Sequence, residues 1–132
     1  MCEFLSKKAQ EEAQKLGVDI SFAIVDEGGN LKFFRRFKEA LLLSIHLVPK
    51  KAYTSVITRS KTEDVAKYSK EGESLMGIHT TDSRICLVSG GYPLFIGNKL
   101  IGGIGVGGGS EAEDKQIAEA ILGAFANFIA SH

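Results

Sequence analysis

The stretch VDISFAIVDEGGNLKFFRRF, residues 18–37, holds two apolar runs around a short turn and decides the fold. Residues 18–25 are rich in β-branched side chains, which favour an extended strand. The turn that follows contains Gly28 and Gly29, which tolerate the positive φ angles of a tight hairpin. Residues 31–37 supply the return strand. The sequence therefore predicts an antiparallel hairpin, because so short a connection cannot join parallel strands.

The rest of the chain surrounds this hairpin with helices and a second set of strands. Further strands are expected at residues 84–88, 92–96 and 99–106, with turns at Gly90-Gly91 and Gly97-Asn98. Helical spacing of apolar residues predicts helices over residues 4–16, 49–57, 62–68 and 111–130. The expected fold class is α/β, more narrowly α+β, with a five-stranded antiparallel sheet covered by helices.

Length and composition predict one domain, residues 1–132. The 16 basic and 16 acidic residues cancel, so no net charge attracts the chain to nucleic acid or to an anionic membrane. The longest apolar stretch, residues 40–48, is too short to cross a bilayer. The first residues lack the pattern of a secretory signal, and the two cysteines are far apart in sequence. We therefore expect a cytoplasmic protein with reduced thiols.

Five segments of the chain resemble motifs of the GlcG/HbpS family, also called DUF336 or the haem-degrading domain family. They are VDEGGNL (25–31), KKAYTS (50–55), GGYPL (90–94), IGGIGVGG (101–108) and Glu113-Asp114. They occur in the family's order and cover nearly the whole chain. The resemblance implies a profilin-like α/β/α sandwich and a homo-oligomer.

The resemblance also implies a range of functions. Some members of the family bind haem, and members occur in gene clusters for propanediol, glycerol or glycolate utilisation. One branch is the C-terminal domain of PduO-type proteins, whose separate N-terminal domain is a cobalamin adenosyltransferase. We expect a non-catalytic, oligomeric protein that binds haem, another tetrapyrrole or a small organic acid. The alternatives are an accessory enzyme for haem degradation, cobalamin-linked or hydroxy-acid chemistry, and a scaffold without a small ligand.

The glycine-rich segment at residues 102–109 is a candidate ligand site. The N–H groups of Gly107, Gly108 and Gly109 precede a helix and are placed to receive a carboxylate or phosphate. Alternatively, these glycines let the sheet approach a helix or a neighbouring subunit closely. Acidic residues at the start of the helix would repel an anion, which favours the packing interpretation.

Two basic pairs, Arg35-Arg36 and Lys50-Lys51, lie near family motifs. Arg36 and Lys51 are the candidates for a cationic wall facing a carboxylate ligand. The expected pocket lies between the sheet, the helix that begins at Pro49 and the glycine-rich loop. Solvated charge or salt bridges between subunits explain the same residues and are favoured over ligand binding.

His46 is the candidate axial ligand for a haem iron, because histidine is the usual protein donor. The other histidines lie in a polar loop and at the last position. For His46, packing in the core or in a subunit interface is favoured over a role as ligand. No spacing typical of a zinc site occurs, and the Glu-x-x-Glu pair linked with iron binding in the secreted branch is absent.

The sequence offers no recognisable catalytic nucleophile. Asp26 is placed to be a general base, but an aspartate before a turn is equally expected to bond the N–H groups of that turn. Thr62 is explained as a helix cap, and Cys86 as a buried thiol in a strand. The residues therefore favour ligand binding over catalysis.

Overall fold

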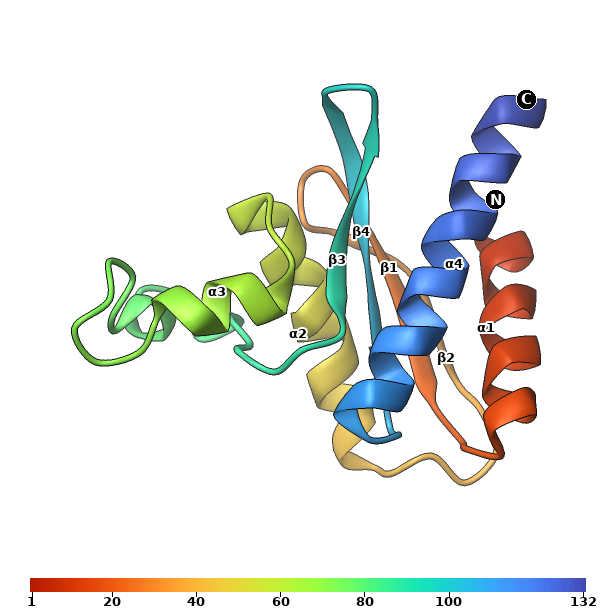
Figure 1. Cartoon of the computed structure of the whole chain (residues 1–132), viewed down its shortest axis with the longest axis horizontal. Helices are drawn as coiled ribbons and strands as arrows, with labels where there is room; N and C mark the ends of the chain where they lie inside the picture. The colour runs from red at the N-terminus through yellow and green to blue at the C-terminus, as the bar shows by residue number, and fades with distance from the viewer.

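The computed structural model describes all 132 residues and contains four α-helices and four strands (Figure 1). No helix combines the length and the apolar character that crossing a membrane requires. In chain order the elements are α1 (Cys2–Leu16), β1 (Ser21–Asp26), β2 (Leu31–Arg36), α2 (Leu43–Thr58), α3 (Thr62–Tyr68), the 3₁₀ turn η1 (Ile78–Thr80), β3 (Gly91–Ile96), β4 (Lys99–Gly107) and α4 (Glu111–Ser131).

The four strands form one sheet in the order β2-β1-β4-β3, and every neighbouring pair is antiparallel. The two predicted hairpins, β1–β2 and β3–β4, are confirmed. Strands β1 and β4, far apart in sequence, join them: Ser21 lies opposite Gly107, and Asp26 lies opposite Gly102. In Figure 1 the tip of the β3–β4 hairpin extends past the end of α2.

The β1–β2 turn confirms the local interpretation of Asp26. Its Oδ1 accepts hydrogen bonds from the N–H groups of Gly28 and Asn30, each at 2.9 Å. These bonds, with the Asn30 amide first among them, lower the pKa of Asp26. Gly29 has a φ of 81°, which the absence of a Cβ permits. The carboxylate thus holds the turn.

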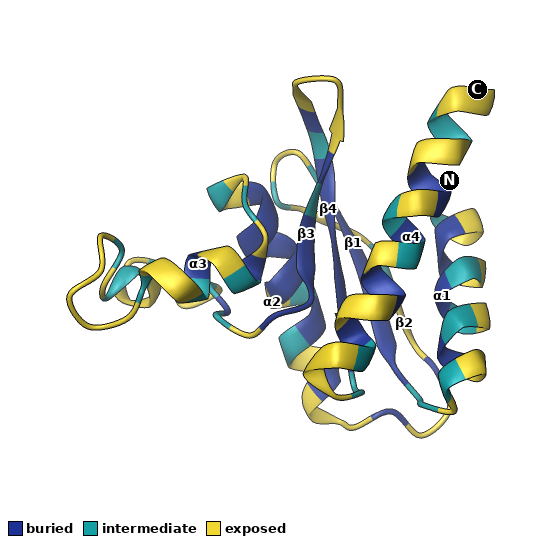
Figure 2. Cartoon of the chain, in the orientation of Figure 1, coloured by how far each residue is buried: buried dark blue, intermediate teal, exposed yellow.

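The core lies on both faces of the sheet, because the side chains of β1 alternate between them. Phe22 and Ile24 belong to the larger apolar cluster, shared with α1 and α4. Ala23 and Val25 belong to the smaller cluster, shared with α2. Figure 2 shows β1, most of β4 and the sheet-facing sides of these helices as buried. The chain is therefore a three-layer α/β/α arrangement, as expected.

The expected fifth strand does not exist, and the sheet has four strands instead of five. Residues 84–88 run beside α2 as an irregular segment. The N–H of Cys86 donates to the Oγ1 of Thr54 at 2.8 Å, so a helix side chain takes the place of a neighbouring strand. The backbone of this segment thus bonds to a helix side chain, which an extended run in the sequence does not reveal.

Helix α2 begins six residues before Pro49, where the sequence predicted its start. A proline inside a helix lacks one backbone donor and is normally unfavourable. Packing compensates here, because Val48 is fully buried and the Ser44 hydroxyl is 2.7 Å from that of Ser21 on β1. Tertiary contacts therefore extend the helix backwards past the proline.

Helices α1, α3 and α4 match the predicted ranges within two residues at each end. Gly17 ends α1 in the left-handed conformation with a φ of 69°. Ser110 and Glu113 form a reciprocal capping box at the start of α4. The cap predicted for Thr62 is wrong: Lys61 occupies that position, and the Thr62 hydroxyl accepts a hydrogen bond from the N–H of Gly91.

Candidate functional site

The glycines of β4 bring the sheet into direct contact with α2. A Cβ on Gly105 would lie 2.2 Å from the carbonyl oxygen of Val48, and one on Gly103 would lie 2.4 Å from the Ser55 hydroxyl. Real side chains cannot approach so closely. The hollow expected between this strand and the helix is therefore filled, and these glycines serve close packing.

Lys51 lies inside this contact, with only 2% of its side chain exposed. Its Nζ donates to the carbonyl oxygen of Val106 at 2.9 Å and lies 3.6 Å from the Oδ2 of Asp114. A Cβ on Gly90 or Gly107 would come within 3.0 Å of the ammonium group. Part of the glycine pattern thus makes room for a buried cation.

Burial shifts the pKa of both members of this ion pair. Loss of hydration lowers the pKa of Lys51, and the attraction of Asp114 offsets this shift only in part. Loss of hydration also raises the pKa of Asp114 to about 6, although Lys51 and the Gly109 N–H act in the opposite direction. Lys51 therefore joins α2 to β4 and α4 from the interior.

Two backbone donors at the end of the glycine-rich loop already have partners. The N–H of Gly109 donates to the Oδ1 of Asp114 at 3.0 Å, and that of Ser110 donates to the Oε1 of Glu113 at 2.8 Å. Gly108 has a φ of 124° and packs against the backbone of Asp19. A carboxylate of the chain thus occupies the Gly109 donor, one of the three that the sequence offered to an anionic ligand.

Arg36 and Lys51 have different partners. The Nε of Arg36 donates to the carbonyl oxygen of Ala40 at 2.8 Å, in the loop after β2. Lys51 is bonded to β4 and paired with α4. The structure therefore does not join them in one cationic wall.

His46 lies on the solvent-exposed side of α2, beside an apolar surface. Leu42 and Leu43, four and three residues before it, are 67% and 62% exposed. Lys50 follows four residues after it and is also exposed. Residues at these spacings share one face of a helix. His46 is thus not packed in the core of the monomer.

A cluster that sequence reasoning missed joins α2 to the irregular segment. The Tyr53 hydroxyl donates to the Oδ2 of Asp82 at 2.5 Å, and the Arg84 guanidinium donates to the same carboxylate from Nε and Nη2. The guanidinium also lies 4.1 Å from the centre of the Tyr53 ring. Arg84 is the first cause of the lowered pKa of Asp82, and the bond to Asp82 raises the pKa of Tyr53.

This cluster borders a hollow of about 140 Å³ between the β1–β2 turn and α2. The lining residues are Val25, Gly29, Leu31, Pro49, Lys50, Tyr53 and Arg84. In the sequence, an aspartate two residues before an arginine was the only indication of this cluster, and it fell at the start of a predicted strand. The contact between Asp82 and Tyr53 joins residues far apart in sequence, so no periodic pattern in the sequence indicates it.

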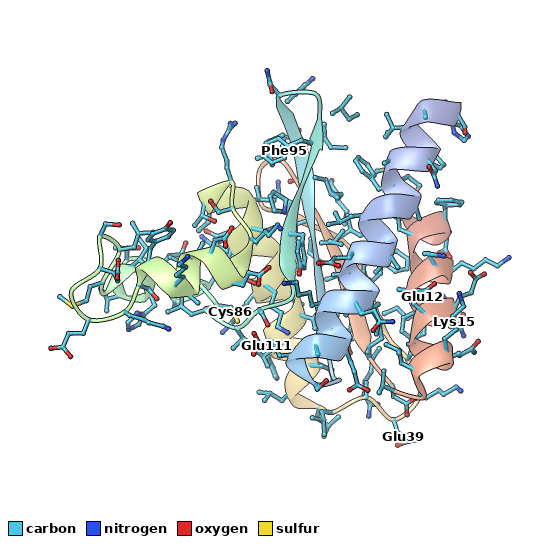
Figure 3. All side chains as sticks on the ribbon, in the orientation of Figure 1. Glu12, Lys15, Glu39, Cys86, Phe95 and Glu111 are labelled. Carbon is cyan, nitrogen blue, oxygen red and sulfur yellow. The ribbon has the colours of Figure 1, made fainter.

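The chain has no group of three or more His, Cys, Asp and Glu side chains placed to hold a bare metal ion. Both cysteines are free thiols, and Cys86 is buried beside α2 (Figure 3). All three histidines are exposed, and His46 is the one that lies on α2 beside exposed leucines.

These features define a helix-covered antiparallel α+β domain with an exposed histidine and a small cationic hollow on α2. The chain belongs to the HbpS-like family, since residues 2–123 match the family model described as "Haem degrading protein HbpS-like". The resemblance stated from the motifs is thereby confirmed.

Sequence relatives and a solved structure agree with this family assignment. It is 32% identical to an uncharacterized 15.0 kDa protein in the dhaT–dhaS intergenic region of Citrobacter freundii, over 92% of this chain and 86% of that protein. It is 36% identical to the corrinoid adenosyltransferase PduO of Salmonella typhimurium, over 91% of this chain but only 36% of PduO. The crystal structure of a PduOC–haem complex superposes with a TM-score of 0.89 at 35% identity, over 92% of this chain and 89% of that one.

Proposed function

We propose that this chain is a non-catalytic binding protein that holds haem or a related tetrapyrrole on the exposed face of α2. The observation that carries the proposal is the His46 imidazole, which is accessible to solvent and flanked by the exposed side chains of Leu42 and Leu43. The family assignment and the haem complex of PduOC support the same ligand class.

The side chains on this face fit the chemistry of haem. An imidazole nitrogen is a suitable axial ligand, leucines contact the apolar macrocycle, and an ammonium group pairs with a propionate. His46, the two leucines and Lys50 supply these groups on one helix. Haem would bring its iron chemistry, and these residues would hold and orient it.

We further propose that a second copy of the chain covers this face. Leu41 is 64% exposed and continues the apolar surface of Leu42 and Leu43. Three adjacent exposed leucines are unfavourable in water and typical of a contact surface. A homo-oligomer would bury them and shield a haem bound at His46.

We also propose where the protein acts. The family resemblance implies a role beside propanediol, glycerol or glycolate utilisation, which we place in the cytoplasm; similarity to PduO and to the dhaT–dhaS intergenic protein agrees with the family branch. The corrinoid adenosyltransferase activity in the name of PduO belongs to the full-length PduO protein, and this chain covers only 36% of that protein.

A hemin titration tests the ligand. The wild-type chain should give a saturable shift of the Soret band, and His46→Ala should lose that shift because the axial donor is gone. His79→Ala is the matched control, since it removes an exposed histidine from the loop after α3. It should bind hemin like the wild type.

Two results would contradict the proposal. One is a Soret shift that never saturates. The other is equal binding by the His46→Ala and His79→Ala variants. Loss of hemin absorbance in the presence of a reductant, with free hemin stable, would favour haem degradation over simple binding.

A further inference from the structure

We propose that the hollow between the β1–β2 turn and α2 binds a carboxylate group, either that of a small organic acid or that of a haem propionate. This site adjoins the surface around His46 and shares Lys50 with it, but the inference does not require haem to bind at His46. The inference rests on the shape of the hollow, its charge and its free hydrogen-bond donors.

The hollow has an apolar floor and a polar rim. Val25 on β1 is 2% exposed and Tyr53 on α2 is 9% exposed, so its base is dry and fixed. Gly29 forms one wall, and a Cβ there would lie 3.0 Å from the Tyr53 ring. The absence of a side chain at this turn therefore keeps the site open.

The charged residues that line the hollow are both cations. Lys50 and Arg84 contribute to the wall, and no carboxylate does. None of the ion pairs in the structure includes Lys50, so its ammonium group has no partner of opposite charge within 4.0 Å. Arg84 is neutralised by Asp82, which leaves Lys50 as the net positive charge facing the hollow.

The Arg84 guanidinium is fixed in place with donors to spare. Asp82 accepts hydrogen bonds from its Nε and Nη2, and the Tyr53 ring packs against its face. A guanidinium carries five N–H donors, and Asp82 takes two of them. Donors held in this way bind a carboxylate with little loss of side-chain entropy.

The size of the hollow limits its ligand. A volume of about 140 Å³ equals the space of four to five water molecules at about 30 Å³ each. A short-chain acid fits this space, whereas a tetrapyrrole ring does not. Lys50 lies one helical turn from His46, so the carboxylate has two possible sources: a free acid, or the propionate arm of a haem held at His46.

A larger hollow on the chain lacks the excess of positive charge found in the proposed site. A cavity of about 410 Å³ beside the glycine-rich loop is lined by three carboxylates, those of Glu63, Glu111 and Asp114, and by two lysines. A carboxylate ligand would be repelled there. The smaller hollow is therefore the better anion site.

Amide NMR of the ¹⁵N-labelled chain tests the site, with glycolate and propionate as probes and glycolamide and propionamide as neutral controls. The acids should shift the Gly29 amide resonance saturably, and the amides should not. Lys50→Met should weaken acid binding at least tenfold. Lys99→Met is the matched control, because it removes an exposed lysine from the distant β3–β4 turn and should bind like the wild type.

A second set of NMR titrations, with hemin and hemin dimethyl ester, distinguishes a free acid from a haem propionate as the source of the carboxylate. If free acids leave Gly29 unmoved but hemin shifts it and hemin dimethyl ester does not, the carboxylate comes from the haem. If neither free acids nor hemin shift it, the proposal is overturned. It is also overturned if acids and amides act equally, or if Lys50→Met and Lys99→Met bind equally well. Haem binding at His46 can fail while acid binding persists, so the two proposals are tested separately.

Discussion

At the scale of single residues, the buried pair of Lys51 and Asp114 places two charged groups in an environment that disfavours their charged forms. Two charges are removed from water, and their separation of 3.6 Å exceeds that of a close hydrogen-bonded pair. Desolvation is the first cause of both pKa shifts, so attraction within the pair does not fully compensate. In return, the pair ties α2, the end of β4 and the start of α4 together at one point.

The raised pKa of Asp114 predicts a specific dependence of stability on pH. The folded state binds the Asp114 proton more tightly than the unfolded state does, so this residue's contribution to the free energy of unfolding increases as the pH falls from about 6 to about 4. At about 1.36 kcal/mol per pKa unit, the rise to about 6 corresponds to about 3 kcal/mol.

Urea unfolding of the wild type and of Asp114→Asn from pH 4 to pH 7 measures this contribution. The wild type should gain stability relative to the variant as the pH falls, because asparagine does not titrate. Other carboxylates, such as Asp26 with its lowered pKa, are common to both proteins and cancel in the difference. A difference that is constant, or that grows with pH, would show that the pKa of Asp114 is not raised in the folded chain.

At the scale of elements, α2 is the framework of the molecule. Its buried side packs on the sheet, and its hydroxyl groups hold the segment that replaces the fifth strand. The Thr54 hydroxyl accepts the N–H of Cys86 at 2.8 Å, and the Thr62 hydroxyl, at the start of α3, accepts that of Gly91. Two threonines thus satisfy backbone donors that a sheet neighbour would otherwise satisfy.

Thr54→Val should destabilise the chain by about 1–3 kcal/mol, because it leaves the buried N–H of Cys86 without an acceptor. Thr58→Val is the control on the same helix, since the Thr58 hydroxyl bonds only the carbonyl of its own helix. Chemical denaturation gives the free energies, and hydrogen exchange should be faster at Cys86 in Thr54→Val alone. Equal effects of the two variants would show that the tether adds no stability.

At the scale of the whole molecule, exposed apolar residues gather where the sequence has its most continuous apolar run. Leu41, Leu42 and Leu43 precede the buried part of α2. Phe95 and Ile96 near the end of the β3–β4 hairpin are also exposed, as Figure 3 shows for Phe95. A second copy covering such surfaces is consistent with the oligomer proposed above.

Leu42→Asp should convert the oligomer to monomers, because a charge buried in an apolar contact is unfavourable. Sedimentation velocity measures the assembly state, and circular dichroism checks the fold. Leu31→Asp is the control, with an exposed leucine of the same kind on the edge strand β2. If the wild type is already monomeric, or if both variants assemble equally, the leucine surface of α2 is not the contact.

Much of the fold was predictable from local chemistry. The β1–β2 hairpin followed from Gly28, Gly29 and the turn-bonding Asp26, whose interactions span only a few residues. The start of α2 and the fate of residues 84–88 were mispredicted. In both cases a contact distant in sequence, Ser21 with Ser44 or Thr54 with Cys86, outweighs the local preference.

The candidate site was less predictable than the fold. His46 was identifiable by residue type, but its exposure beside three leucines was not. Lys51 was proposed as a cationic wall, and the structure places it in the interior; its neighbour Lys50 faces the small hollow. One residue along a helix rotates a side chain by about 100°, so the two lysines of a pair have opposite environments.

The sequence by itself determined the antiparallel hairpins, the ends of α1, α3 and α4, and the family, because turns, caps and motifs are read within short segments. Only the tertiary structure decided that β1 joins β4, that a fifth strand is absent, that Lys51 is buried with Asp114, and that Tyr53, Asp82 and Arg84 meet. These contacts join residues tens of positions apart. They depend on how helices and sheet pack, which periodicity and propensity do not encode.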